Sequence, residues 1–146
     1  MVAKAFVDTN ILLRAMIPQM NQHSQCESLV QKLWDDDVEL WINRQVIREY
    51  TVQATHPNSF SPPLTITQII TQMNTITTLL RVADETQTIT AKLFELLANY
   101  PTTRGKQVHD TNLVATMLVY GIDTLVTLNE SDFRRFGSLI KIVTIV

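Results

Sequence analysis

The sequence predicts an α/β fold, in which helices cover both faces of a parallel sheet. Short runs rich in Val, Ile and Leu alternate along the chain with longer segments whose apolar residues recur at helical spacing. This alternation is typical of parallel sheets, because the helix that joins two parallel strands packs back onto the sheet. No internal repeat, low-complexity tract or linker interrupts the pattern, so we expect residues 1–146 to form a single domain.

The N-terminal part of the chain begins with a short apolar run that ends at Asp8. Asp8, Thr9 and Asn10 favour the N-cap of a helix, and Pro18 stops that helix. An apolar stripe that includes Cys26 marks a second helix. The elements expected here are a strand over 4–7, helices over 11–17 and 21–34, a strand over 38–42, and a helix that carries Val46, Ile47 and Tyr50.

The rest of the chain opens with three prolines between residues 56 and 64, which predict a loop. Asp84 or Thr86 is expected to cap a later helix, and Gly121 is expected to end another as its C′ residue. The remaining elements expected are a helix over 65–80, a strand over 81–83, a helix reaching Leu97, a polar loop over 100–106, a helix over 107–120, a strand over 122–127, a helical turn over 130–136 and a strand over 140–146.

Composition limits the classes of protein to consider. The formal net charge is −2, whereas a protein that binds nucleic acid through phosphate contacts alone is usually strongly basic. Bound divalent metal ions neutralise charge locally, so this value is compatible with a nuclease. The single cysteine, Cys26, excludes an internal disulfide and a multi-cysteine zinc site. Because there is no long apolar run and no secretory signal, we expect no membrane helix and a cytoplasmic location.

Four carboxylates are expected to meet at one edge of the predicted sheet. Asp8 stands at the carboxyl end of the first strand, and Asp132 follows the fourth strand closely. Glu49 and Asp110 fall in the early turns of helices that open at the same edge, where ligands bind in open α/β sheets. Hard cations such as Mg²⁺ and Mn²⁺ prefer oxygen ligands, so the sequence predicts a divalent metal site here.

Each residue of this group also has an alternative interpretation. Asp110 continues an apolar stripe on its helix and so points inward, but it also suits a helix N-terminus as a capping carboxylate. Asp8 suits the cap between strand and helix equally well. Glu49 is compatible with a solvated helix surface, and Asp132 with the start of a short helix. His109 beside Asp110 is expected to be a structural hydrogen-bonding residue, since the three histidines are scattered along the chain.

Three segments resemble the motifs of PIN-domain proteins, and they occur in the family's order. The first is Phe-Val-Asp-Thr-Asn-Ile-Leu-Leu, which contains Asp8. The second is Val-His-Asp-Thr-Asn-Leu-Val-Ala-Thr-Met-Leu, which contains Asp110, and the third is Leu-Val-Thr-Leu-Asn-Glu-Ser-Asp-Phe, which contains Asn129 and Asp132. The resemblance runs from Ala5 to the last strand, while residues 56–103 show nothing diagnostic.

This resemblance implies a three-layer α/β/α fold with about five parallel strands in the order 3-2-1-4-5. It implies an acidic triad of Asp8, Glu49 and Asp110, a fourth acidic residue in Asp132, and support from Thr9 and Asn129. Glu49 is assigned by its position and helix rather than by a sharp motif, and Asn129 stands where many relatives have Asp. It also implies a VapC-type toxin, a dimeric Mg²⁺- or Mn²⁺-dependent endoribonuclease inhibited by a small antitoxin protein encoded beside it.

The hypothesis for function is hydrolysis of RNA by a water molecule that the metal activates, with a carboxylate accepting its proton. Arg104, in the loop before Asp110, is a candidate for contact with substrate phosphates, and a solvated loop residue is its alternative. A second hypothesis is a binding or scaffold module that keeps the acidic pocket without turnover, which the acidic balance and Asn129 favour. The predicted dimer surface is a helical hairpin over 65–97.

Overall fold

The computed structural model describes residues 2–145 and contains a sheet of five parallel strands in the order β3-β2-β1-β4-β5. This confirms the predicted fold class and strand order. The elements are β1 (Lys4–Val7), α1 (Thr9–Met16), α2 (His23–Asp35), β2 (Glu39–Asn43), α3 (Arg44–Thr55), α4 (Ile66–Leu79), β3 (Arg81–Ala83), α5 (Gln87–Asn99), α6 (Gln107–Tyr120), β4 (Thr124–Val126), α7 (Glu130–Phe133), a 3₁₀ turn (Arg134–Phe136) and β5 (Lys141–Val143).

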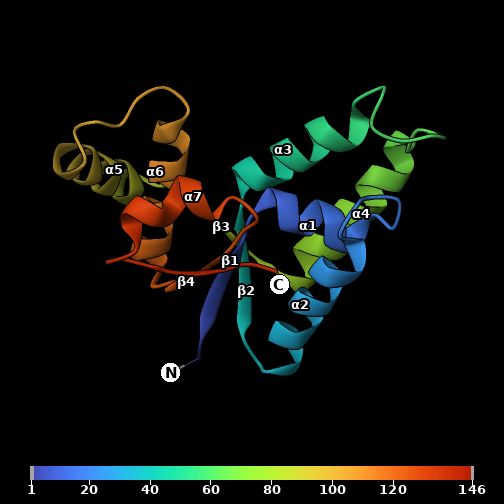
Figure 1. Cartoon of the computed structure of the whole chain (residues 1–146), viewed down its shortest axis with the longest axis horizontal. Helices are drawn as coiled ribbons and strands as arrows, with labels where there is room; N and C mark the ends of the chain where they lie inside the picture. Colours follow the sequence, from blue (N-terminus) through green and yellow to red (C-terminus); the bar gives the residue numbers. More distant parts are fainter. Residues whose placement is uncertain (1, 146) are drawn as a thin grey trace.

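Helices lie on both sides of this sheet, as the sequence predicts. Helices α1 to α4 connect β1, β2 and β3 and lie together on one side, while α5, α6 and α7 lie on the other (Figure 1). Strand β1 is at the centre, and its residues Ala5, Phe6 and Val7 are fully buried. β1 pairs with β2 on one side and with β4 on the other. Strands β2 and β3 thus lie on one side of β1, and β4 and β5 lie on the other. The strand order changes direction between β1 and β4, and this place is the switch point of the fold.

The local signals in the sequence explain most element boundaries. Asp8, Asn43, Thr65 and Thr86 each cap the helix that follows by accepting a hydrogen bond from a backbone N–H. Helix α1 begins at Thr9, two residues earlier than predicted, because Asp8 itself is the cap. The last two strands are shorter than expected, and Val146, the end of the predicted final strand, lies outside the described residues.

The apolar residues of α4 and α2 are only partly buried. On α4, Ile69 and Ile76 are buried, but Ile66 and Ile70 are 60% and 54% exposed. On α2, Cys26 is fully buried as predicted, whereas Trp34 is 46% exposed. Only part of each helical stripe meets the sheet, because α4 contacts the remainder of the fold mainly through α3 and β3.

The prediction of a helical hairpin over 65–97 is wrong, because its two helices pack against different elements. Helix α4 packs against α3, and α5 packs against α6 on the other side of the sheet, with β3 between them in the chain (Figure 1). Exposed apolar side chains therefore fall on two separate surfaces, Ile66, Ile70 and Leu79 on α4 and Phe94 on α5. Within residues 2–145, none of the helices combines the length and the apolar character needed to cross a bilayer.

Gly121 ends α6 in a backbone conformation that favours glycine. It ends α6 with a φ of +69°, and the next N–H, that of Ile122, donates to the carbonyl of Met117 at 2.8 Å. A Cβ at this position would meet no atom within 4 Å, so the cost of Gly121→Ala is conformational. We expect this variant to lose about 1 to 2 kcal/mol of unfolding free energy in urea titrations. Gly121→Asn should lose less, because Asn tolerates this conformation; equal losses would contradict the explanation.

Candidate acidic active site

Asp8 occupies the switch point and forms the base of the site. It follows β1 directly, and only 9% of its surface is exposed. Its Oδ1 accepts a hydrogen bond from the N–H of Thr9 at 2.8 Å, and its Oδ2 accepts one from the hydroxyl of Thr127 at 2.8 Å. Burial raises the pKa of this carboxyl above its ordinary value, the two hydrogen bonds lower it, and the nearby Glu49 and Asp132 raise it again.

Thr127 contacts the candidate site but was not selected from the sequence. It directly follows β4, is fully buried, and holds Asp8 from 119 positions away in the chain. Its hydroxyl also accepts a hydrogen bond from the N–H of Asn129 at 3.0 Å. Its position at the end of a strand next to β1 was the available signal, because polar side chains there face the same edge as Asp8.

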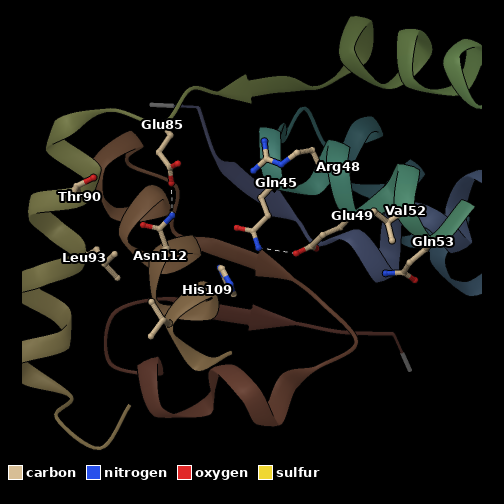
Figure 2. Close-up of a pocket in the computed structure, with 11 residues that line it drawn as sticks. Gln45, Arg48, Glu49, Val52, Gln53, Glu85, Thr90, Leu93, His109 and Asn112 are labelled. Atoms are coloured by element: carbon tan, nitrogen blue, oxygen red, sulfur yellow. Dashed lines mark hydrogen bonds between the residues drawn. The ribbon is translucent and has the colours of Figure 1, made fainter. Parts of the chain in front are cut away.

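Glu49 is joined to the site by two neighbours. Its Oε2 accepts a hydrogen bond from the Thr9 hydroxyl at 2.8 Å, and its Oε1 accepts one from the amide of Gln45 at 2.8 Å (Figure 2). Thr9 thus contacts Asp8 through its backbone and Glu49 through its side chain. These two contacts are what a supporting role of Thr9 requires, whereas no role was predicted for Gln45.

Asp110 is half-buried in the first turn of α6, on the side of the sheet opposite to α3. Burial, together with repulsion from Asp132, Asp8 and Glu49, raises its pKa to about 6, and Arg135 partly opposes the shift. The Asp110 carboxylate accepts no hydrogen bond from any described residue. A carboxylate in such surroundings is stabilised when a cation joins it.

One cavity of about 190 Å³ brings Asp8, Glu49 and Asp110 together. Asn129 lines it too, as do Asn43 and Gln45, which the sequence reasoning did not select. None of the described residues that line it is Lys or Arg. Its lining residues are Asp8, Asn43, Gln45, Val46, Glu49, His109, Asp110, Leu113, Asn129 and Phe133.

Of three further residues singled out in the sequence, Asp132 and Arg104 lie outside this cavity and His109 lines it. Asp132 is exposed and does not line this cavity, although it is near enough to raise the pKa of Asp8 and Asp110. Arg104 is also exposed, and its guanidinium donates to the carbonyls of Pro101 and Thr103 in its own loop. His109 was expected to be a structural hydrogen-bonding residue, but its imidazole makes no hydrogen bond within residues 2–145 and lines the cavity.

Arg135 is the cation that partly opposes the raised pKa of Asp110. Arg135 donates from Nη2 to the backbone carbonyl of Gln107 and to the hydroxyl of Thr111, both at 3.3 Å. Its guanidinium also lies over the ring of Phe136, with 4.5 Å between the guanidinium carbon and the ring centroid. Arg135 thereby fixes the first turn of α6, which carries Asp110.

The chemistry of the donor set fits a hydrated divalent cation. Asp8, Glu49 and Asp110 offer only oxygen ligands, and no Lys or Arg among the lining residues given above pairs with them. In the part of the chain that the structure describes, no three acidic, histidine or cysteine side chains are close enough together to hold an ion by themselves. Mg²⁺ keeps several water ligands and binds through one or two carboxylates, so it does not require such a cage.

Comparison of the fold with solved structures identifies toxins of toxin–antitoxin systems. VapBC2 from Rickettsia felis, bound to a promoter DNA fragment, is similar over 98% of this chain and 99% of its own, with a TM-score of 0.70 and 20% identity. This chain has a PIN-domain fold. VapBC-1 from nontypeable Haemophilus influenzae is similar over 97% of both chains, with a TM-score of 0.68 and 17% identity.

A third PIN-domain relative by structure is VapC20 from Mycobacterium tuberculosis, a toxin that cleaves the Sarcin-Ricin loop. It is similar over 90% of this chain and 94% of its own, with a TM-score of 0.65 and 14% identity. At the level of sequence, no family model matches the chain, and no curated protein is significantly similar to it. The PIN-domain likeness therefore rests on the arrangement of the elements.

The raised pKa of Asp110 predicts a specific pH dependence of stability. Between the ordinary value of 3.8 and about 6, the folded protein binds more protons at Asp110 than the unfolded chain does. The free energy of unfolding attributable to this group therefore falls as pH rises through that window. In EDTA, Asp110→Asn should raise the melting temperature relative to the wild type at pH 7 and much less at pH 4.

Asp37→Asn is the matched control for this measurement. Asp37 is exposed, lies before β2 at the opposite end of the sheet, and has a φ of +59° that Asn tolerates. Its effect should not follow the same pH window. Parallel pH profiles for the wild type and Asp110→Asn would contradict the assignment of Asp110 to a repulsive acidic site.

Proposed function

We propose that this chain is a metal-dependent endoribonuclease, formed as one nuclease domain, that hydrolyses RNA phosphodiester bonds. The observation that carries the proposal is the meeting of Asp8, Glu49 and Asp110, from three different elements, around one cavity at the switch point of the sheet. The similarity in fold to a toxin that cleaves the Sarcin-Ricin loop supports the same activity.

Asp8, Glu49 and Asp110 are the residues that would hold Mg²⁺ or Mn²⁺. The ion, when bound, lowers the pKa of a water molecule and offsets the negative charge that develops on the phosphate. Thr9 and Thr127 fix the carboxylate of Asp8, and Thr9 and Gln45 fix that of Glu49. A positioned carboxylate accepts the proton of the attacking water, and Asp110 is suited to this because no described residue donates to it.

Hydrolysis by water breaks the bond between phosphorus and the 3′ oxygen of the ribose. The products are a 5′-phosphate and a 3′-hydroxyl, because the attacking oxygen comes from water and the 2′-hydroxyl takes no part. Asn129, which lines the cavity, is placed to orient the water or the phosphate. Asp132 lies outside the lining and contributes negative charge to the site.

Within this proposal the protein acts in the cytoplasm as the toxin of a toxin–antitoxin pair. Solved structures of similar fold are complexes of such pairs, including one from Klebsiella pneumoniae. The exposed apolar side chains of α4 and α5 supply two separate surfaces, one suited to a second copy of the chain and the other to a small antitoxin. The expectation of a homodimer with a bound antitoxin is consistent with this arrangement.

A second candidate function is a binding module without turnover. It is favoured by the lack, within residues 2–145, of three ligands already placed to hold an ion, and by the net charge of −2. Only the enzyme requires RNA cleavage that a chelator abolishes, whereas the module binds metal or RNA, or serves as a scaffold, without cleaving RNA.

Substitution of the acidic residues tests the catalytic assignment. Asp8→Asn and Asp110→Asn remove charge and metal affinity while they keep the shape of the side chain, and each should lower the rate of RNA cleavage at least about a hundredfold. The rate is measured with purified protein, mixed RNA and Mn²⁺, with and without EDTA. Asp37→Asn makes the same chemical change on the exposed opposite edge and should cleave at the wild-type rate. Wild-type rates for all three variants would refute the nuclease mechanism.

Direct metal binding separates loss of the ion from loss of chemistry. Titration of the wild type with Mn²⁺ in a calorimeter should give saturable binding, and Asp8→Asn should weaken that binding at least about tenfold. Asp37→Asn should leave it unchanged. Binding without cleavage would select the module, whereas no binding of Mn²⁺ or Mg²⁺ to the wild type would eliminate the metal-dependent enzyme.

A further inference from the structure

A hollow of about 640 Å³ lies beside the acidic cavity, between α3 on one side and α5 and α6 on the other (Figure 2). Gln45, Glu49 and His109 line both the hollow and the cavity, so the two spaces adjoin. The volume is within the range of sites that receive small organic ligands. An RNA chain with its scissile phosphate in the cavity therefore has an adjacent space for one neighbouring nucleotide.

Two amide side chains in this hollow have their orientation fixed by carboxylates. Gln45 donates from its amide nitrogen to Glu49 at 2.8 Å, and Asn112 donates from its amide nitrogen to Glu85 at 2.6 Å (Figure 2). A carboxylate accepts only, so the nitrogen must face it and the carbonyl oxygen must face elsewhere. No described residue donates to Oε1 of Gln45 or to Oδ1 of Asn112. The hollow thus presents two side-chain acceptors.

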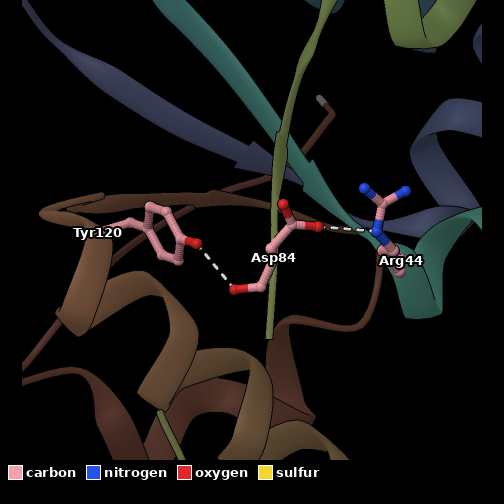
Figure 3. A network of polar contacts seen from close by, with 3 residues as sticks. All are labelled: Arg44, Asp84 and Tyr120. Carbon is pink, nitrogen blue, oxygen red and sulfur yellow. Dashed lines mark hydrogen bonds and ion pairs between the residues drawn. The ribbon is translucent and has the colours of Figure 1, made fainter. Parts of the chain in front are cut away.

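The position of Glu85 is itself fixed by its neighbour Asp84. The Asp84 carboxylate accepts from Nε of Arg44 at 2.7 Å, and its backbone carbonyl accepts from the hydroxyl of Tyr120 at 2.7 Å (Figure 3). Arg44 begins α3 and Tyr120 ends α6, so the segment that carries Glu85 is held from both sides of the hollow. The acceptor on Asn112 is therefore part of a preorganised wall.

The remainder of the lining suits the ring and the phosphate of a nucleotide. Val52, Leu93 and Val108 provide apolar surface for the face of a base, and 66% of Val52 is exposed. Arg48 lines the same hollow, and no ion pair or hydrogen bond to its guanidinium occurs within residues 2–145. A free guanidinium at this place is a ligand for phosphate.

We propose that this hollow binds the nucleotide next to the scissile phosphate and selects bases that carry an exocyclic amino group. Oε1 of Gln45 and Oδ1 of Asn112 accept hydrogen bonds from the base, and Arg48 contacts its phosphate. Adenine, cytosine and guanine each present an exocyclic amino group with two N–H donors, whereas uracil presents only its N3–H donor between two carbonyl acceptors that would face the acceptors of the hollow. The proposal rests on the proposed nuclease function and adds a base preference to it: uridine is disfavoured at one position beside the cut.

Binding of nucleoside monophosphates tests the base preference without cleavage. AMP, CMP, GMP and UMP are each titrated into the full-length protein in EDTA, and the backbone amide signals are followed by NMR. Signals of the α3 and α6 residues that line the hollow should shift, and at least one amino-bearing nucleotide should bind about fivefold more tightly than UMP, the value of one hydrogen bond. Asn112→Leu should remove that difference, and Asn74→Leu, on the exposed surface of α4, should retain it.

Equal binding of all four nucleotides, or shifts confined to residues outside the hollow, would overturn the proposal. If Asn112→Leu fails to fold, Asn112→Ser replaces it and should likewise remove the discrimination. A second arm digests a randomised RNA pool with the wild type and Mn²⁺ and sequences the cut ends. Uridine should be depleted at one position beside the cut for the wild type and restored there for Asn112→Leu.

The two arms separate this inference from the nuclease function. Cleavage without any depletion of uridine would overturn the base preference and leave the nuclease function standing. Discrimination among the monophosphates without cleavage would retain the base site and refute the nuclease function. Loss of total activity in Asn112→Leu with an unchanged base profile would assign Asn112 a structural role and also overturn the proposal.

Discussion

The burial of the Asp8 carboxyl between β1 and β4 is the constraint on which the rest of the site depends. A carboxylate removed from water is costly unless its oxygens are paired, and Asp8 has a backbone N–H on one oxygen and a threonine hydroxyl on the other. Those two donors come from the start of α1 and from the residue after β4. The pairing of β1 with β4 therefore determines whether Asp8 receives its hydrogen bond from Thr127. Glu49 and Asp110 add further negative charge around this fixed point.

The sheet and its helices followed from signals that are local in the sequence. Helix caps, the glycine after α6 and short β-branched runs act within a few residues, so they identified each element in order. The exposure of Ile66, Ile70 and Trp34 was not predictable, because the width of an apolar stripe does not state how much of it another element covers. That information belongs to the packing of α2 and α4, which is non-local.

The acidic residues of the site were predictable from their places along the chain, whereas its supporting residues are defined by contacts between side chains. Asp8 follows a strand, while Glu49 and Asp110 lie in the first two turns of their helices, and the parallel topology brings such positions to one edge. Thr127, Gln45 and Asn112 act through side-chain hydrogen bonds, which depend on rotamers and distances. Asp132 and Arg104 occupy the expected segments, but their side chains turn to solvent or to their own loop.

The separation of Asp8 and Thr127 along the chain has a consequence for biosynthesis. β4 is synthesised long after β1, and it must insert beside β1 before the hydroxyl of Thr127 reaches Asp8. Contacts between residues so far apart form late, since the intervening loop must close first. A nascent chain that has not yet reached Thr127 therefore leaves one oxygen of Asp8 without its hydroxyl partner and lacks the Asn129 wall of the acidic cavity.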